Sequence, residues 1–170
     1  MIRVANFEKV TQREFVKAWV EEFGYSEKEA ADIYDRVKKP VRATKGSAGY
    51  DFISPIDFTL KPGDTMKIPT GIRAKIEDGY VLMCFPRSGL GFKYRLQLDN
   101  TVGIIDSDYY YSDNQGHIFI KITNDAVEDW KVMNIKAGEG FAQGIFVPFG
   151  ITMDDAVTEE RNGGFGSTTK

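Results

Sequence analysis

The sequence changes character at Pro40, and this change limits the possible folds more than any other feature. Between Thr11 and Lys39 the only glycine or proline is Gly24, and apolar residues recur at the spacing of a helix. After Pro40 the apolar residues fall in short runs, which end at turn residues such as Pro62-Gly63 and Asp78-Gly79. Closely spaced strands of this kind are typical of a sandwich or barrel. The sequence therefore predicts an all-β domain with a small helical hairpin near the N-terminus, over residues 11–39.

The predicted hairpin has its own start and stop signals. Phe15 and Trp19 lie four residues apart on the first helix, and Gly24 suits its end. Ser26 followed by Glu29 is a capping-box pattern for the start of a second helix. Each helix has one apolar face, which must pack on something. We favour an elaboration on the outside of the β domain, and the alternative is a docking surface for another protein.

The bulk composition narrows the class of protein. A chain of 170 residues suits one domain with a substantial core, and 42% hydrophobic and 28% charged residues are ordinary for a globular protein. The net charge is −3 and no block of lysine or arginine stands out, so we expect no nucleic-acid partner. No apolar run approaches the length of a membrane span, so we expect no membrane partner.

The single cysteine and the single histidine both lie in strand-like runs. Cys84 is predicted to be a buried strand residue, and one cysteine excludes an intramolecular disulfide framework. Because disulfides are rare in the cytoplasm, we expect a cytoplasmic protein. His117 is predicted to be a structural residue rather than a catalyst or a ligand.

The last ten residues, 161–170, have the composition of a phosphate-binding segment. Arg161 is followed by three glycines, one serine and two threonines around Phe165. Glycine lets a ligand approach the backbone closely, hydroxyls and amides donate hydrogen bonds, and arginine pairs with an oxyanion. No helix follows to complete the anion site, as one does after a P-loop. The segment is therefore either a frayed terminus or a mobile arm that orders over a phosphate held elsewhere.

Polar residues also mark three turns beside predicted strands. Asp51 starts a strand after the small residues 47–49, as an ordinary turn aspartate would. Arg87 and Ser88 enter a glycine turn after an apolar strand, which suits phosphate contact and is also a common turn. Gln143 follows a tight turn and would orient either a ligand or a backbone group.

A further turn brings an acidic and an aromatic residue together. Asp106 ends an apolar hairpin, and Tyr109 follows three residues later. A general base would then lie beside an aromatic stacking platform. The alternative is a hairpin turn with acidic residues that only favour the turn.

Taken in order, these segments resemble the five motifs of the trimeric dUTP diphosphatase (dUTPase) family. The motifs are Ala48–Asp51, Pro86–Gly89, Gly103–Asp106 with Tyr109, Gly138–Gln143 and Arg161–Thr168. The resemblance covers the chain from about residue 40 to the end. It implies a jelly-roll-like β domain over residues 1–160 and a homotrimer with active sites shared between subunits. Residues 161–170 would be a mobile glycine-rich arm that covers the site of another subunit.

The resemblance also implies an enzyme that hydrolyses dUTP to dUMP and diphosphate with the help of Mg²⁺. This activity limits uracil in DNA and supplies dUMP for dTMP synthesis. Asp106 would activate the water that attacks the α-phosphorus, and Asp51 would hold the Mg²⁺ through its water shell. Arg87 and Gln143 would contact the phosphates in the transition state.

Substrate recognition would fall to a larger set of residues. Tyr109 would pack against the deoxyribose and leave no room for the 2′-hydroxyl of UTP, and Phe165 would stack on the uracil. The other substrate-binding residues implied by the resemblance are Ser88, Gly89, Asn100, Gly103, Ile105, Arg161, Gly166, Ser167 and Thr168.

The chain departs from the family pattern in two places that matter here. Gly140 stands where the fourth motif usually has an arginine. In the third motif the residues 110–115 intervene between Tyr109 and Gly116, where the family normally reaches its next glycine almost directly.

Two alternative functions share this fold. The related dCTP deaminases use a glutamate as general base, and aligning on Gly116 and Asn124 puts Lys121 at that position, which disfavours deamination. A nucleotide-binding regulator that contacts a partner through residues 11–39 is the other alternative, and the complete set of catalytic residues argues against it.

Overall fold

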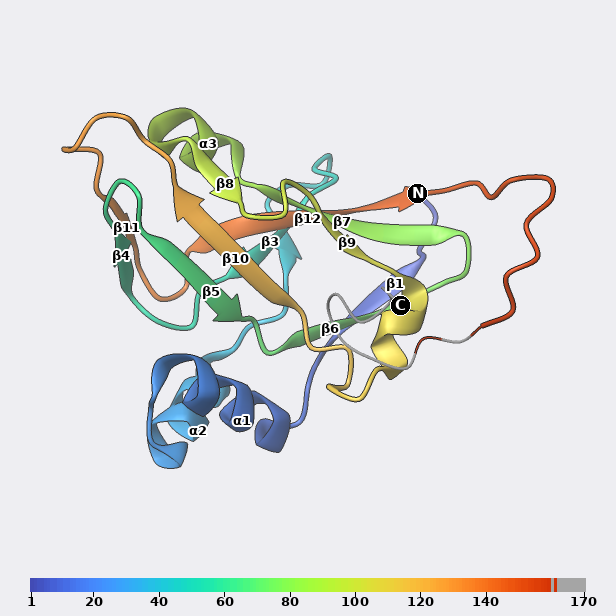
Figure 1. Cartoon of the computed structure of the whole chain (residues 1–170), viewed down its shortest axis with the longest axis horizontal. Helices are drawn as coiled ribbons and strands as arrows, with labels where there is room; N and C mark the ends of the chain where they lie inside the picture. The colour runs from blue at the N-terminus through green and yellow to red at the C-terminus, as the bar shows by residue number, and fades with distance from the viewer. Residues whose placement is uncertain (160, 162–170) are drawn as a thin grey trace.

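The computed structural model describes residues 1–159 and 161. In this part of the chain the secondary structure is mostly strands, which confirms the predicted β-rich fold (Figure 1). The strands are β1 (Ala5–Lys9), β2 (Val41–Arg42), β3 (Tyr50–Ile53), β4 (Phe58–Leu60), β5 (Thr65–Pro69), β6 (Ile72–Ile76), β7 (Tyr80–Pro86), β8 (Leu96–Leu98), β9 (Gly103–Ile105), β10 (Phe119–Asn124), β11 (Met133–Ile135) and β12 (Gly140–Pro148). The helices are α1 (Gln12–Phe23), α2 (Glu27–Arg36), α3 (Ser88–Tyr94) and the 3-10 helix η1 (Ser107–Tyr111).

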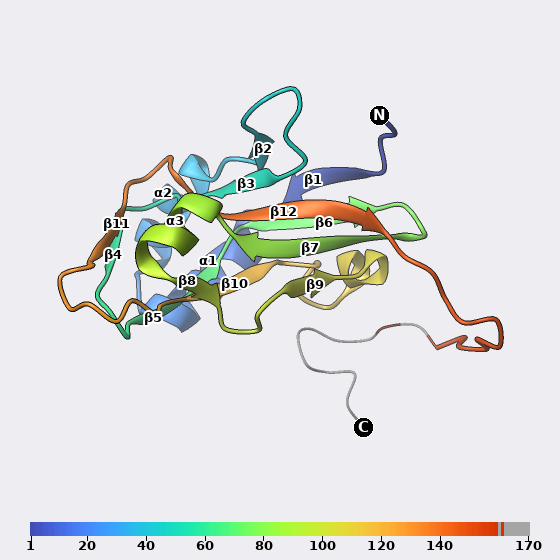
Figure 2. The same cartoon turned by 90° about the horizontal axis from the view of Figure 1, so that it is seen from above.

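The largest sheet has five strands in the order β2-β3-β12-β7-β9, and its neighbouring strands are antiparallel. Figure 2 shows the long strands β12 and β7 side by side, with β9 next to β7. A second sheet, β5-β10-β8, and the pairs β1-β6 and β11-β4 complete the β structure of the described residues. Residues on the inner faces of these sheets form one core, which includes Phe52, Leu82, Cys84, Ile122 and Met133.

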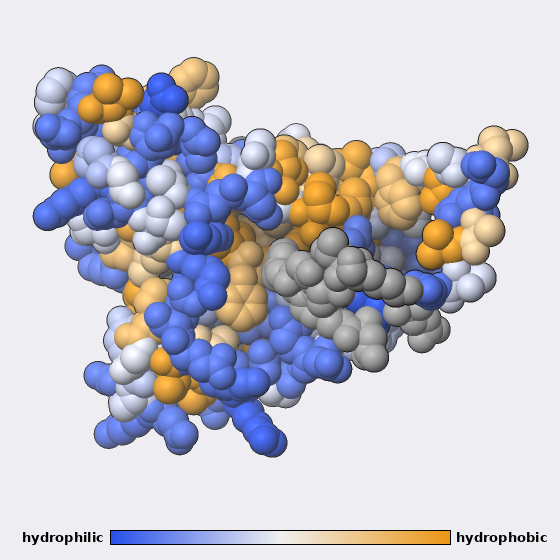
Figure 3. Space-filling view, in the orientation of Figure 1, coloured by the Kyte–Doolittle hydropathy of each residue, from blue (hydrophilic) through white to orange (hydrophobic). Residues whose placement is uncertain are grey.

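The outer face of the five-stranded sheet is also apolar. Inward and outward side chains alternate along β7, where Leu82 and Cys84 are buried and their neighbours are half-buried. Cross-strand pairing puts apolar residues of β9 and β12 beside the outward residues of β7. Figure 3 shows apolar side chains gathered over the region where these strands lie in Figure 1. The outward residues are Val81, Met83, Phe85, Ile104, Ile145 and Val147.

Helix α1 begins and ends at the signals read from the sequence. The Thr11 side chain caps its start by accepting from the Glu14 N–H, and Gly24 ends it with a left-handed φ of 70°. Phe15 and Trp19 are fully buried, and Trp19 Nε1 donates to the Pro69 carbonyl at 2.8 Å. Full burial of one large apolar side chain contributes about 1.5–3 kcal/mol. Helix α1 is therefore part of the core.

Helix α2 packs on α1 and starts with the expected capping box, in which Ser26 and Glu29 bond reciprocally. Its buried residues are Ala30 and Ile33. The apolar faces that suggested a docking surface thus cover the chain's own core. Among the described residues, no helix combines the length and the apolarity needed to span a membrane.

Candidate functional site

The predicted site residues that the structure describes fall into two groups at opposite ends of β7. At the first end, strand β12 lies between β3 and β7, and Gln143 pairs with Asp51 on one side and with Phe85 on the other. Directly opposed residues point to the same face of a sheet. The side chains of Asp51 and Gln143 therefore share the outer face, next to the point where β7 ends and Arg87 begins the turn into α3.

Arg87 holds this first group together. Its Nε lies 3.1 Å from Asp51 Oδ1, and its Nη1 donates to the Gly140 carbonyl at 3.0 Å. Gln143 Nε2 donates to the Pro86 carbonyl at 3.0 Å, which fixes the amide beside the same turn. The Arg87 side chain is 39% exposed and that of Asp51 is 18% exposed. A guanidinium with this much exposure can still donate to an incoming oxyanion.

Two glycines give these side chains their room. A Cβ on Gly49 would clash with Gln143 Oε1. A Cβ on Gly140 would lie 3.1 Å from Arg87 Nη1 and 3.1 Å from Asp51 Cβ. Gly140, which stands where the resemblance leads us to expect an arginine, therefore leaves room for the side chains of Arg87 and Asp51 to lie close to its backbone. The sequence motif includes Gly49 but indicates no role for it, because Gln143, the residue that a larger side chain would meet, lies on another strand.

A cavity of about 320 Å³ opens beside this group. It is lined by Arg87, Leu90, Lys93, Tyr94, Asn134, Ile135, Glu139 and Gly140. Its wall carries two cations, Arg87 and Lys93, and one carboxylate, Glu139, so the excess of positive charge suits an anionic ligand. The predicted phosphate residues Ser88 and Gly89 form the first turn of α3 at the same end of β7.

The second group lies where β9 runs into η1. Asp106 follows Ile105 directly, and its backbone carbonyl accepts from the Tyr109 N–H at 3.2 Å. Arg161 Nη2 donates to Asp106 Oδ2 at 2.6 Å, and Arg161 Nε donates to Asp108 Oδ1 at 3.0 Å. The Asp106 side chain is 47% exposed. Arg161, the first residue of the predicted arm, thus binds Asp106, the predicted general base.

Tyr109 is buried in this group, with 3% of its surface exposed. Its hydroxyl donates to the His117 carbonyl at 2.7 Å and accepts from Asn114 Nδ2 at 2.8 Å. Burial raises the pKa of Tyr109 to about 12. The phenol therefore keeps its proton at neutral pH and has a fixed orientation. Sequence reasoning missed Asn114, although its place in the longer third-motif loop was a signal.

Asn100 and Gly103 lie near each other at the start of β9. A Cβ on Gly103 would lie 3.7 Å from Asn100 Nδ2 and 3.1 Å from Cys84 Cβ, so glycine favours the close approach of the hairpin to β7. Cys84 is buried, as predicted, and burial raises the pKa of its thiol to about 12. Asn100 also borders a cavity of about 470 Å³, lined by Lys67, Asp99, Asn100, Asn114, Phe119 and Lys121.

The two groups are far apart within one chain. Ile105 pairs with Leu82, so Asp106 lies beside Val81, whereas Arg87 follows the other end of β7. Six residues of strand at about 3.3 Å each separate these positions by roughly 20 Å. The structure thus brings together Asp51, Arg87 and Gln143 at one end, and Ile105, Asp106, Tyr109 and Arg161 at the other, whereas Gly103 lies beside Cys84 near the middle of β7. The predicted residues Phe165, Gly166, Ser167 and Thr168 lie outside the described residues.

Comparison with known proteins decides the family. The family model described as dUTPase matches residues 35–169. The chain belongs to the dUTPase family. It is 42% identical over 132 residues to the deoxyuridine 5′-triphosphate nucleotidohydrolase of Lactococcus lactis, covering 76% of this chain and 86% of the relative. The corresponding protein of Paraburkholderia xenovorans is 43% identical over 147 residues, covering 82% of this chain and 94% of the relative.

Solved structures agree with this assignment. The crystal structure of dUTPase from Streptococcus mutans matches with a TM-score of 0.61 and 32% identity, covering 86% of this chain and 98% of that chain. The dUTPase of phage phi11 of S. aureus matches with a TM-score of 0.63 at 22% identity, covering 92% of this chain and 97% of that chain, and this likeness concerns the fold alone. The predictions of the dUTPase family and of an enzyme are confirmed. Helices α1 and α2 lie almost entirely before the residues that the family model matches.

Proposed function

We propose that this dUTPase-family chain hydrolyses dUTP to dUMP and diphosphate, and that it limits uracil in DNA and supplies dUMP in the cytoplasm. The observation that carries the proposal is the group at the Arg87 end of β7. There the carboxylate of Asp51 and the amide of Gln143 share one face of the sheet, and the cation Arg87, which pairs with Asp51, also lines an open cavity. These are the groups that bind and polarise a phosphate chain, and the family assignment supplies the substrate class.

At the Arg87 end, Arg87 and Gln143 would donate to phosphate oxygens as negative charge develops on them. Asp51 is the metal-binding candidate. Among the described residues, no group of three or more His, Cys, Asp or Glu side chains could hold a metal. Mg²⁺ is usually bound by one or two carboxylates together with waters and substrate phosphates, and a single carboxylate beside phosphate-binding residues fits that mode. When bound, the ion would neutralise charge on the triphosphate.

At the other end, Asp106 would accept the proton of the attacking water. Its Oδ2 accepts from Arg161 Nη2 at 2.6 Å, and the second carboxylate oxygen, Oδ1, is a further acceptor for that proton. We propose that Arg161 moves from Asp106 to another anion when the substrate binds. The β- and γ-phosphates of dUTP, which the resemblance assigns to Arg161, are suitable partners for its guanidinium.

One chain alone would not complete this site. A general base acts at about 2.6–3.2 Å from the proton it takes, directly or through one water. Asp106 and Arg87 lie too far apart along β7 to act on one phosphorus, so a second copy must supply one of them. The apolar outer face of β7, β9 and β12 is a suitable contact surface between copies. We therefore propose a homotrimer of jelly-roll-like domains with shared active sites.

The test is release of diphosphate from dUTP with Mg²⁺, measured beside UTP, dCTP and dTTP. Asp106→Asn should lower kcat by about 10²–10⁴-fold, because a general base contributes this much, while dUTP binding remains. Asp78→Asn is the matched control, since it removes an equal charge from an exposed residue in the turn before β7. Turnover of dUTP by Asp106→Asn at the wild-type rate would contradict the proposal.

The same assay separates the alternative functions. Lys121 Nζ pairs with Asp99 Oδ2 at 2.9 Å, and an ion-paired lysine does not serve as the general base of a deaminase. Ammonia released from dCTP would favour deamination. Tight dUTP binding by the wild-type protein without turnover would favour a regulator.

A further inference from the structure

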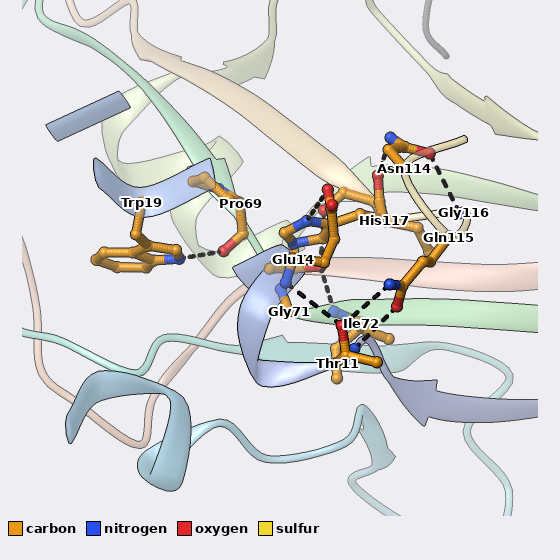
Figure 4. A network of polar contacts seen from close by, with 12 residues as sticks. Thr11, Glu14, Trp19, Pro69, Gly71, Ile72, Asn114, Gln115, Gly116 and His117 are labelled. Carbon is orange, nitrogen blue, oxygen red and sulfur yellow. Dashed lines mark hydrogen bonds and ion pairs between the residues drawn. The ribbon is translucent and has the colours of Figure 1, made fainter. Parts of the chain in front are cut away.

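The longer loop of the third motif is tied to helix α1. The Thr11 N–H donates to Gln115 Oε1 at 3.0 Å, and Gln115 Nε2 donates to Thr11 Oγ1 at 3.0 Å (Figure 4). Thr11 is the N-cap of α1, where its hydroxyl also accepts from the Glu14 N–H. One glutamine side chain therefore joins the start of a helix to a loop 104 residues away in the sequence.

A buried histidine makes a second connection between α1 and the same loop. His117 Nε2 accepts from the Gly71 N–H at 2.8 Å, so the neutral ring carries its proton on Nδ1. Nδ1 lies 3.8 Å from Glu14 Oε1 on α1. Gly71 has a left-handed φ of 74°, and a Cβ there would lie 2.9 Å from Phe15 Cδ2. The His117 ring is therefore held between the first turn of α1 and the backbone before β6 (Figure 4).

The loop in turn holds the site tyrosine. Among the described residues, two groups bond the Tyr109 hydroxyl, the His117 carbonyl and Asn114 Nδ2, and both belong to this loop. Gly116 lets the loop fold back, because its φ is 71° and a Cβ there would lie 2.7 Å from Tyr110 Cα. Residues 114–117 thus connect α1 to the phenol of Tyr109.

We propose that α1 and residues 112–117 form one positioning unit that fixes the Tyr109 ring and so sets how strictly the site rejects a ribonucleotide. This inference rests on the proposed function, and it assigns Gln115 and His117 as positioning residues. A ring excludes a 2′-hydroxyl only if it cannot move away, and its freedom to move depends on the loop behind it. Helix α1, which precedes the residues that the family model matches, and the longer third-motif loop then act together on Tyr109.

Gln115→Ala tests this unit, because it removes both bonds to Thr11 from a partly exposed site and leaves the core intact. Gln97→Ala is the matched control, since Gln97 is an exposed glutamine whose Nε2 donates to Asp125 Oδ2 at 2.8 Å. The readouts are kcat and KM for dUTP and UTP, and amide hydrogen exchange over residues 107–117. We expect Gln115→Ala to lower the dUTP-to-UTP ratio of kcat/KM by about three- to tenfold, the effect of one or two hydrogen bonds. The change should lie mainly in KM, with faster exchange in the loop, and Gln97→Ala should change neither.

Substitutions at Thr11 provide an independent check. Thr11→Ser keeps the hydroxyl and should keep the wild-type ratio, whereas Thr11→Ala should shift it in the same direction as Gln115→Ala. A wild-type ratio and wild-type exchange in Gln115→Ala would overturn the proposal. If the wild-type protein does not hydrolyse dUTP, the proposed function fails, and the exchange measurement alone still decides whether α1 fixes the loop.

Discussion

The two ends of strand β7 carry the two halves of the candidate site, and they are built in different ways. The Arg87 end follows from the pairing of three neighbouring strands, and its contacts stay within the sheet and the turn that leaves it. The Asp106 end consists of a short helix and loops, held by Thr11 from one part of the chain and Arg161 from another. The proposed phosphate end is therefore preformed, whereas the proposed base and sugar end depends on distant segments.

Arg87→Ala should have the largest effect at the phosphate end. It removes the cation that bonds Asp51 and the Gly140 carbonyl, and loss of one donor to transition-state charge costs about 10²–10³-fold in kcat. Steady-state kinetics with dUTP would measure it. Arg95→Ala removes an exposed arginine from the other end of α3 and should leave kcat near the wild-type value. Equal losses in the two variants would mean that Arg87 has no special role.

Gly49→Ala should have a smaller effect at the same end. Its Cβ would displace the Gln143 amide by direct clash, so we expect kcat/KM for dUTP to fall by about tenfold, the worth of about 1.4 kcal/mol of lost interaction. Gly46→Ala is the control, since a Cβ there meets nothing within 4 Å. If Gly49→Ala is as active as Gly46→Ala, the phosphate end is less rigid than its contacts suggest.

Local sequence patterns predict the strands and their buried residues, whereas they do not predict contacts between residues far apart in the chain. Alternating apolar runs and turn residues indicate a β-rich fold, and the buried environment of Cys84 follows from its strand. The neighbourhood of Asp51 and Gln143 depends on register between strands far apart in the chain, which residue pattern alone does not specify, and only the family motifs brought them together. The contact of Gln115 with Thr11 leaves no local pattern, because each residue separately looks like an ordinary turn or cap.

His117→Gln should have the smallest effect, and it concerns the Asp106 end. Burial lowers the pKa of His117 below its ordinary value of 6.5 in the folded protein, although Glu14 opposes this. The unfolded state therefore binds the proton more strongly, so the contribution of His117 to stability is present above about pH 6.5 and is lost as the pH falls. The free energy of unfolding can fall through this titration by at most about 1.4 kcal/mol per pH unit.

Urea unfolding at pH 7.5 and 5.5, at one protein concentration, would measure this difference. The free energy of unfolding of the wild-type protein should fall more between these pH values than that of His117→Gln. An equal fall in both proteins would show that His117 does not titrate in this range.

In the proposed assembly, the two ends of β7 act together only between copies of the chain. This arrangement can be tested by mixing the variants Arg87→Ala and Asp106→Asn, unfolding them together and refolding them. Each hybrid assembly can then pair an intact Asp106 from one copy with an intact Arg87 from another. After random mixing in equal amounts, a site is active only when one copy supplies an intact Asp106 and another supplies an intact Arg87. Each condition is met in about half of the cases, so about a quarter of the wild-type rate of dUTP hydrolysis should return. A mixture that stays as inactive as its components, while wild-type protein treated in the same way recovers its rate, would show that the two ends do not form a site between copies.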